Sequence, residues 1–268
     1  MRAKKRYGQH FLQSAWADKL VAAMDPQPGD RFVEIGPGPG ALTLRLAPRV
    51  SHVTAVELDE ELVAMLAPRL PPNVTLICAD FLGFDIQSVA RDAPVRVAGN
   101  LPYNASSPIL FRLLDTHRRQ GGLVDATLMV QLEVAERIAA APGTKDYGVL
   151  SIFVQLHADV RRLLTLPPGA FRPAPKVRSS VVRLKFRPPA VPLDDEPTFE
   201  AMVRSMFTQR RKTLQNALRP FAVARGMSSA EVLAEAAIDA SRRPETLQLT
   251  ELARLADLFT SARGRAVL

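Results

Sequence analysis

The pattern with the most chemical content is a glycine-rich turn that is followed, at the end of the next apolar run, by an acidic residue. The turn is Glu34-Ile35-Gly36-Pro37-Gly38-Pro39-Gly40, and an apolar run from Phe32 leads into it. Glycine lets backbone N–H groups at the start of a helix approach a ligand without a Cβ atom in the way. Glu57 lies 21 positions after Gly36 and can accept hydrogen bonds from ribose hydroxyls. The pattern predicts a nucleotide or S-adenosylmethionine site, and a strand-to-helix turn without a ligand stays open as the alternative.

A further acidic residue closes the third apolar run, in Cys78-Ala79-Asp80-Phe81-Leu82. The carboxylate of Asp80 can accept a hydrogen bond from the amino group of adenine while apolar side chains cover the ring, although an acid in any exposed turn looks the same. The run from Val74 to Ile77 predicts that the Cys78 thiol is buried and not a nucleophile. A single cysteine excludes an internal disulfide and favours a reducing, cytoplasmic setting.

The tetrapeptide Asn100-Leu101-Pro102-Tyr103 follows the fourth apolar run and favours one of these ligands. The lone pair of an exocyclic adenine amine is conjugated with its ring, so the nitrogen is a poor nucleophile until it is held pyramidal. The side-chain oxygen of Asn100 and a carbonyl oxygen of Leu101 or Pro102 can each accept one N–H of that amine. Tyr103 offers a face on which the base can stack. The motif matches that of amino methyltransferases acting on nucleobases, with an ordinary Asn-Pro turn as the alternative.

Five short apolar runs that alternate with helical patterns must position these residues. The runs are Phe32 to Ile35, Val53 to Val56, Val74 to Ile77, Val95 to Ala98 and Ala126 to Val130. Such alternation predicts a mostly parallel sheet that binds ligands where its strands end. We therefore expect an α/β fold, a Rossmann-like methyltransferase sheet with helices on both faces.

A proline-rich segment from Pro188 to Pro197 interrupts this pattern, and it contains the acidic run Asp194-Asp195-Glu196. Prolines and an abrupt change of composition are typical of a domain boundary. The residues beyond it have apolar side chains at helical spacing. We therefore predict a methyltransferase domain at residues 1–190 and a small all-α domain at residues 191–268.

The chain is basic, with 35 Lys and Arg against 27 Asp and Glu and a formal charge of +8. Such a balance favours a polyanionic partner, nucleic acid or an anionic membrane surface, although solubility alone also explains it. Residues 161–187 contain eight basic residues and no acid, and residues 203–225 contain six and no acid. Phe171, braced by prolines among basic residues, could be a second stacking surface or a core residue. The basic segments are expected to contact RNA phosphates, with a solvated face as the alternative.

Six motifs follow one another along nearly the whole chain: Lys4-Lys5-Arg6-Tyr7-Gly8-Gln9-His10-Phe11-Leu12, Glu34-Ile35-Gly36-Pro37-Gly38, Glu57-Leu58-Asp59, Asn100-Leu101-Pro102-Tyr103, Phe171-Arg172-Pro173-Ala174-Pro175-Lys176-Val177 and Arg210-Arg211-Lys212-Thr213-Leu214. In this order they resemble the bacterial small-subunit ribosomal RNA adenine dimethyltransferases, of the rRNA adenine N6-methyltransferase family. The resemblance implies N6-dimethylation, with S-adenosylmethionine, of two adjacent adenosines in the 3′-terminal hairpin loop of 16S rRNA on assembling small subunits.

The resemblance also implies roles for single residues. Base-holding roles are implied for Asn100, Tyr103 and Phe171, to which the tetrapeptide adds Leu101 and Pro102. The implied cofactor contacts are His10, Leu12, Gly36, Glu57, Asp80 and Asn100, and the glycine-rich turn adds Gly38. The residues expected to bind RNA are Lys4, Lys5, Arg6, Arg172, Lys176, Arg204, Arg210, Arg211 and Lys212.

Two alternative functions remain at this stage, a dimethylase of the large-subunit RNA and a non-catalytic RNA-binding assembly or transcription factor on the same fold. The four histidines show no ligand spacing with Cys or carboxylates, so we expect no metal site. No apolar stretch is long enough for a signal peptide or a membrane span. We therefore expect a cytoplasmic, monomeric protein that does not bind membranes.

Overall fold

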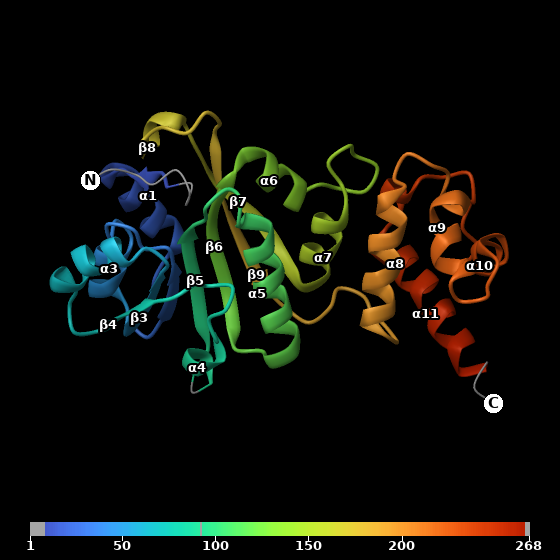
Figure 1. Ribbon diagram of the computed structural model, residues 1–268, viewed down its shortest axis with the longest axis horizontal. Coiled ribbons are helices and arrows are strands. Elements are labelled where there is room, and N and C mark those ends of the chain that lie inside the picture. Colours follow the sequence, from blue (N-terminus) through green and yellow to red (C-terminus); the bar gives the residue numbers. More distant parts are fainter. Residues whose placement is uncertain (1–8, 92, 266–268) are drawn as a thin grey trace. The chain divides into compact units, whose positions relative to one another are not determined.

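The computed structural model describes residues 9–91 and 93–265, with side chains described as far as residue 261. The predicted RNA contacts Lys4, Lys5 and Arg6 lie outside the described residues. The described chain divides into two compact units (Figure 1). Unit 1 comprises the residues up to 136 together with residues 157–188, and unit 2 comprises residues 137–156 and the residues from 189 onward.

The described part of unit 1 contains a seven-stranded sheet in the order β4-β3-β2-β5-β6-β9-β7. The parallel strands are β2 (Arg31–Ile35), β3 (His52–Glu57), β4 (Val74–Cys78), β5 (Val95–Asn100) and β6 (Leu123–Gln131), and the antiparallel ones are β7 (Ala158–Leu166) and β9 (Ser179–Phe186). All five predicted strands are therefore confirmed. The sequence did not reveal β7, because the exposed Arg161 and Arg162 interrupt its apolar pattern at the edge of the sheet.

Helices flank the sheet of unit 1 (Figure 1). They are α1 (Ser14–Met24), α2 (Thr43–Leu46), α3 (Glu60–Leu66), α4 (Gln87–Ala90) and α5 (Ser106–Gln120), with 3₁₀ turns at Ala47–Arg49, Ala67–Arg69 and Pro168–Ala170. Two further helices, α6 (Leu132–Ile138) and α7 (Val149–His157), cross from one unit to the other along the chain. The predicted Rossmann-like α/β class is therefore correct.

Cys78 corrects one prediction, because its side chain is exposed. It ends β4, which lies at one edge of the sheet, and the residues of β4 are exposed or half-buried. An apolar run fixes that a segment forms a strand but not whether neighbours cover that strand on both sides. The edge position of β4 therefore explains the exposure of Cys78.

A separate two-stranded ribbon joins the start of the described chain to a distant segment. In it β1 (Phe11–Leu12) pairs antiparallel with β8 (Phe171–Arg172), so that Leu12 faces Phe171. The backbone N–H of Gln13 continues the contact by donating to the carbonyl of Ala170 at 2.9 Å. Leu12 and Phe171 both belong to the core that also contains residues of α1. The ribbon thereby fixes residues 11–13 against the rest of unit 1.

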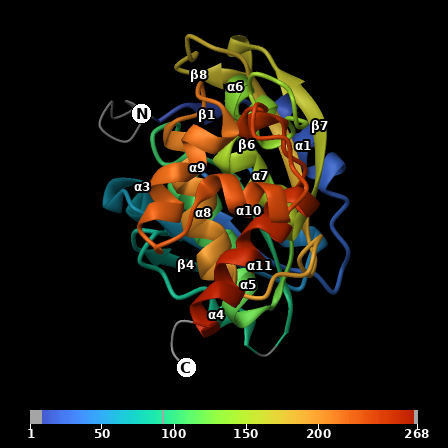
Figure 2. The same ribbon diagram turned by 90° about the vertical axis from the view of Figure 1, so that its right-hand side faces the viewer.

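Unit 2 is helical (Figure 2) and contains α8 (Glu196–Thr208), α9 (Leu214–Val223), α10 (Ser229–Glu235), α11 (Leu249–Arg265) and a 3₁₀ turn at Pro244–Thr246. Asp195 caps α8 and Ser228 caps α10, each by accepting a backbone N–H. Residues 137–156 join this unit through aromatic contacts of Tyr147 with Phe207 and of Phe153 with Phe199. The compact units thus differ from the division predicted near residue 190 mainly in this segment.

Among the described residues, no helix combines the length and the apolar character that a membrane span requires.

Candidate active site

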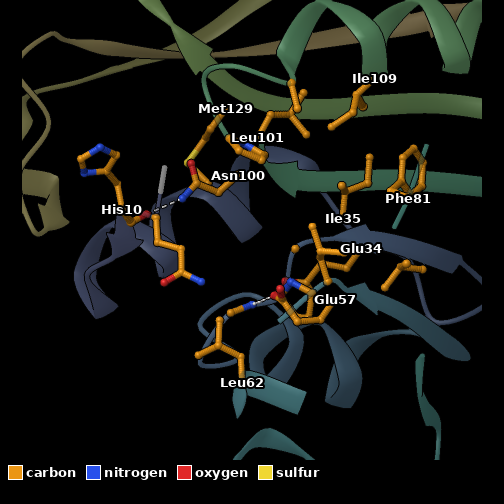
Figure 3. A pocket seen from close by; sticks show the side chains of 18 of the residues that line it. His10, Glu34, Ile35, Glu57, Leu62, Phe81, Asn100, Leu101, Ile109 and Met129 are labelled. Atoms are coloured by element: carbon orange, nitrogen blue, oxygen red, sulfur yellow. Dashed lines mark hydrogen bonds between the residues drawn. The ribbon is translucent and has the colours of Figure 1, made fainter. Parts of the chain in front are cut away.

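A pocket of about 290 Å³ opens where β2, β3, β4 and β5 end (Figure 3). Parallel strands bring their carboxyl ends to the same edge of a sheet, so residues far apart in the sequence meet there. All predicted cofactor residues line this pocket, as do the four residues of the tetrapeptide: His10, Leu12, Gly36, Gly38, Glu57, Asp80, Asn100, Leu101, Pro102 and Tyr103.

The glycine-rich turn forms one wall of the pocket. Gly36 and Gly38 have φ values of 64° and 55°, a left-handed conformation that other residues adopt only with strain. A Cβ atom on Gly38 would also lie 3.3 Å from the ring of Phe11. The helix that follows begins only at Thr43, so the open backbone next to the pocket belongs to the turn itself.

Glu57, at the end of β3, is buried and held by backbone donors. Its Oε2 accepts the N–H of Gly38 at 2.9 Å and its Oε1 accepts the N–H of Asp59 at 3.0 Å. Asp59 is the N-cap of α3: its Oδ1 accepts the N–H of Glu61, and its Oδ2 accepts a hydrogen bond from the side chain of Gln9 at 3.0 Å. The carboxylate that could receive ribose hydroxyls is therefore fixed to the glycine-rich turn.

Glu34 also lines the pocket wall, and the sequence predicted no role for it. It is only 2% exposed, and its Oε2 has no hydrogen-bond partner among the described residues. Burial raises the pKa of Glu34 to about 7, and the charge of Glu57 acts in the same direction. An acid inside the otherwise apolar run from Phe32 to Ile35 was the available signal, because such a residue is rarely buried without a partner.

The segment that follows β4 supplies Asp80 and an apolar surface. Asp80 is exposed, and its Oδ1 accepts the N–H of Leu82 at 2.9 Å. Phe81, which is 5% exposed, and Ile109 line the same part of the pocket wall (Figure 3). A hydrogen-bond acceptor and apolar side chains thus lie together here, while the bond to Leu82 equally fits an exposed turn, so the adenine contact of Asp80 stays a prediction.

Asn100 is oriented by the backbone of the segment that enters β1. Its Nδ2 donates to the carbonyl of His10 at 2.6 Å, across 90 positions of sequence (Figure 3). Because the nitrogen is engaged, Oδ1 is the side-chain atom left to accept a hydrogen bond from a ligand. His10 thus acts on the site through its carbonyl, while its ring Nδ1 lies 2.8 Å from the carbonyl oxygen of Pro173.

The second acceptor of the amine was predicted to be a main-chain carbonyl, that of Leu101 or that of Pro102, and their hydrogen bonds distinguish the two. The carbonyl of Pro102 already accepts the N–H of Ala105 at 2.9 Å and the hydroxyl of Ser106 at 3.2 Å. Among the described residues, no donor reaches the carbonyl of Leu101. Leu101 is therefore the better second acceptor for an amine.

Tyr103 lies in the turn after β5 and is half-buried. Its hydroxyl lies 3.0 Å from Oγ of Ser179, and its ring stacks on that of His10 with a centroid distance of 5.4 Å and an interplanar angle of 28°. Burial raises the pKa of Tyr103, so the hydroxyl stays neutral. The ring is thus held from two sides beside Asn100.

Phe171 differs from its predicted place. Its side chain is 2% exposed, belongs to the core and does not line the pocket. The reason is the pairing of β1 with β8, which turns Phe171 inward against Leu12. This placement corrects the prediction of a stacking surface and favours the core alternative.

The remaining predicted RNA contacts lie on both units. On unit 1, Arg172 and Lys176 are exposed, next to the loop that meets His10. On unit 2, Arg211 and Lys212 are exposed, Arg204 pairs with Glu200 at 2.8 Å, and the half-buried Arg210 donates to Thr144 at 3.2 Å. Among the described residues, no group of three His, Cys, Asp or Glu side chains could hold a metal ion.

Comparisons with known proteins find similar sequences that extend over nearly the whole chain. Residues 1–255 match the family model described as ribosomal RNA adenine dimethylase. The chain is 44% identical over 261 residues to the ribosomal RNA small subunit methyltransferase A of Syntrophotalea carbinolica, covering 96% of this chain and 97% of that one. The protein of the same name from Xanthomonas euvesicatoria is also 44% identical, with 96% of each chain covered.

Two solved structures resemble the fold. A dimethyladenosine transferase from Plasmodium falciparum has a TM-score of 0.78 and 23% identity, with 95% of this chain and 98% of that one covered. The 23S rRNA methyltransferase ErmE has a TM-score of 0.69 and 26% identity, with 93% of this chain and 99% of that one covered. Both likenesses extend over nearly the whole length of the chain.

Proposed function

Because the chain belongs to the ribosomal RNA adenine dimethylase family, we propose that it dimethylates N6 of two adjacent adenosines in the 3′-terminal hairpin loop of 16S rRNA during assembly of the small ribosomal subunit. The observation that supports this proposal most directly is that three groups line one pocket: the oriented amide of Asn100, the open carbonyl of Leu101 and the ring of Tyr103. These are the groups that a flat base with an exocyclic amine requires.

The pocket residues fit S-adenosylmethionine as the methyl donor. The unpartnered oxygen of Glu34 offers an acceptor, and Gly36 and Gly38 leave the backbone of the turn open. Glu57 would accept the ribose hydroxyls and Asp80 the adenine amino group, next to Phe81 and Ile109. When bound, the cofactor supplies a methyl group on a sulfonium, an electrophile that needs only an oriented lone pair.

The chain's own residues prepare that lone pair. Oδ1 of Asn100 and the carbonyl oxygen of Leu101 each accept one N–H of the amine, which draws the nitrogen out of conjugation. The face of Tyr103 holds the base plane by stacking. The methylated amine is acidic enough to lose its proton to water, so the site needs no strong base.

An adenosine in a loop suits such a pocket. An unpaired or weakly paired base is the least expensive to unstack and turn into a protein site. Access to the base therefore favours a hairpin loop over a regular duplex.

The 44% identity to proteins named for the small subunit favours the small-subunit RNA over the large-subunit RNA, since the identity to the 23S enzyme is 26%. The test is methyl transfer from labelled S-adenosylmethionine to purified small and large subunits that lack the modification, followed by mass spectrometry of the RNA. We expect two dimethylated adenosines in 16S rRNA and none added to 23S rRNA. Labelling of large subunits only would reject the proposal.

The RNA partner is expected to meet the basic residues of both units as well as the undescribed residues Lys4, Lys5 and Arg6. Lysine and arginine contacts to phosphates release counterions, which makes binding depend on salt. The double variant Arg210→Ala with Arg211→Ala should weaken binding to small subunits and flatten the plot of log K against log salt by just under one unit per lost phosphate contact.

A matched control is Arg49→Ala with Arg91→Ala. These arginines are exposed and precede β3 and β5, at the edge of the sheet opposite the pocket. Equal salt slopes for the two double variants would show that Arg210 and Arg211 do not contact phosphates and belong to a solvated face.

A further inference from the structure

Tyr103 lies in a loop whose backbone does not fix the orientation of the tyrosine side chain. The residue lies in the turn between β5 and α5 and belongs to neither a strand nor a helix. An aromatic side chain in a turn samples several rotamers unless other residues restrain it. The orientation of the ring must therefore come from contacts made elsewhere in the fold.

Ser179 is one source of that orientation. It is the first residue of β9, where it pairs with Gln131 of β6 on one side and Leu166 of β7 on the other. Its side chain is 1% exposed, and the neighbouring carbonyl of Arg178 accepts the N–H of Leu132 at 3.0 Å. Ser179 is thus held by backbone pairing on both sides, and it is not part of the pocket wall.

The bond from this serine reaches the far end of the tyrosine. Oγ of Ser179 lies 3.0 Å from the phenolic oxygen, 76 positions away in the sequence. A bond at the hydroxyl end fixes the direction of the ring axis, while the stacked ring of His10 covers one face. A base that stacks on Tyr103 must therefore use the opposite face, in one defined plane.

We propose that Ser179 is a positioning residue for methyl transfer, because its hydroxyl fixes the ring of Tyr103 against which the target base stacks. The proposal rests on the proposed function and deepens it, since it adds a residue outside the pocket to the machinery of the same site. Ser179 does not line the pocket and acts only through Tyr103.

The structure offers a matched control in the next residue. Ser180 is also buried in β9, at 0% exposed, and its hydroxyl donates to the carbonyl of Leu164 at 3.1 Å. Ser180→Ala therefore removes a buried serine hydroxyl from the same strand without touching Tyr103. Any loss that comes only from a weakened core should appear in both serine variants.

The experiment is a double-mutant cycle on the single-turnover rate of methyl transfer, at saturating S-adenosylmethionine and unmodified small subunits. Ser179→Ala should lower the rate about fivefold, the factor expected for one hydrogen bond. Tyr103→Phe should lower it by the same factor, and the double variant should lose no more than either single variant. The dissociation constant of the cofactor should stay within about twofold in every variant, and Ser180→Ala should keep the wild-type rate.

Several results would overturn the proposal. One is a double variant that loses the product of the two single factors, about 25-fold on these values. Another is a Ser179→Ala rate equal to that of Ser180→Ala. If Ser179→Ala does not fold, Tyr103→Phe breaks the same bond from the turn, and a wild-type rate in that variant rejects the role. Absence of transfer by the wild-type protein would instead reject the proposed function.

Discussion

The two sides of the pocket are held in place by different means. On the cofactor side, Glu57 is bound by backbone N–H groups of Gly38 and Asp59, and every one of these residues comes from β2, β3 or the turns that follow them. On the acceptor side, Asn100 and Tyr103 are held by His10 and Ser179, residues 90 and 76 positions away. The cofactor side is thus held by contacts between the ends of two neighbouring strands, whereas the acceptor side depends on contacts between segments far apart in the sequence.

This difference makes the two sides separable by mutation. A change on the acceptor side should slow the chemistry and leave cofactor binding almost intact. A change on the cofactor side should weaken binding first. The residues that join the two sides, Gln9 and Phe11, come from the segment around β1.

The largest expected effect is that of Asn100→Ala on the acceptor side. Methyl transfer should fall by about a hundredfold or more, as when one preorganised hydrogen-bonding group is removed from an active site. The dissociation constant of S-adenosylmethionine, measured by calorimetry, should change only a few-fold. Asn216→Ala, at an exposed asparagine of α9 outside the pocket wall, serves as the control and should stay close to the wild-type rate. Equal losses for the two variants would remove Asn100 from its proposed role.

The next effect concerns the cofactor side. Glu57→Ala leaves the N–H groups of Gly38 and Asp59 without their partner and removes the proposed ribose acceptor. Bonds to a charged group contribute about 1.5 to 3 kcal/mol each, so cofactor affinity should fall on the order of a hundredfold. Glu60→Ala, an exposed glutamate three residues further on, should bind as the wild type does. If Glu57→Ala bound S-adenosylmethionine as tightly as the wild type does, Glu57 would not be a cofactor contact and the two sides would not differ in their response to mutation.

Glu34→Gln should change how stability depends on pH. The folded-state pKa of about 7 lies above the ordinary value of 4.5, so the folded protein binds the proton more tightly and becomes less stable as the pH rises from 4.5 to 7. Glutamine carries no charge, and the variant should gain roughly 2 to 3 kcal/mol relative to the wild type between pH 5 and pH 8. Urea unfolding of both proteins without cofactor measures this difference. A constant difference at the two pH values would contradict the raised pKa.

The smallest effect is expected at the junction of the two sides. Gly38→Ala forces a side chain into a left-handed conformation and brings its Cβ to 3.3 Å from Phe11, so unfolding should require about 1 to 2 kcal/mol less. Gly29→Ala is the control, since no atom lies within 4 Å of its added Cβ. Urea unfolding compares the two variants, and equal stabilities would show that the turn tolerates a Cβ atom.

The cofactor side was also the more predictable from the sequence. Glycine spacing, an acid 21 positions later and a further acid after the third apolar run are all local patterns. They pointed to Gly36, Gly38, Glu57 and Asp80, all of which line the pocket, but not to a role for Glu34. On the acceptor side the local sequence predicted only the tetrapeptide that begins at Asn100. No periodicity relates Asn100 to His10 or Tyr103 to Ser179, so the contacts that orient these residues could not be predicted.

The errors have the same origin. Phe171 and Cys78 were interpreted from their neighbours in the sequence, but their exposure depends on what packs over them. Phe171 is buried because β8 pairs with β1, and Cys78 is exposed because β4 is an edge strand. Strand β7 was missed for a related reason, since an edge strand tolerates the charged residues that obscure its pattern.

The amino-acid sequence by itself determined the α/β order of strands, the glycine-rich turn and the residue types that can hold an amine, because these follow from local periodicity and side-chain chemistry. Only the tertiary structure decided which atoms of those residues remain open to a ligand. Pairing of β1 with β8 brings the carbonyl of His10 to Asn100, and β9 brings Ser179 to Tyr103. Such orientation depends on contacts between segments far apart in the chain, and no local pattern encodes which segments meet.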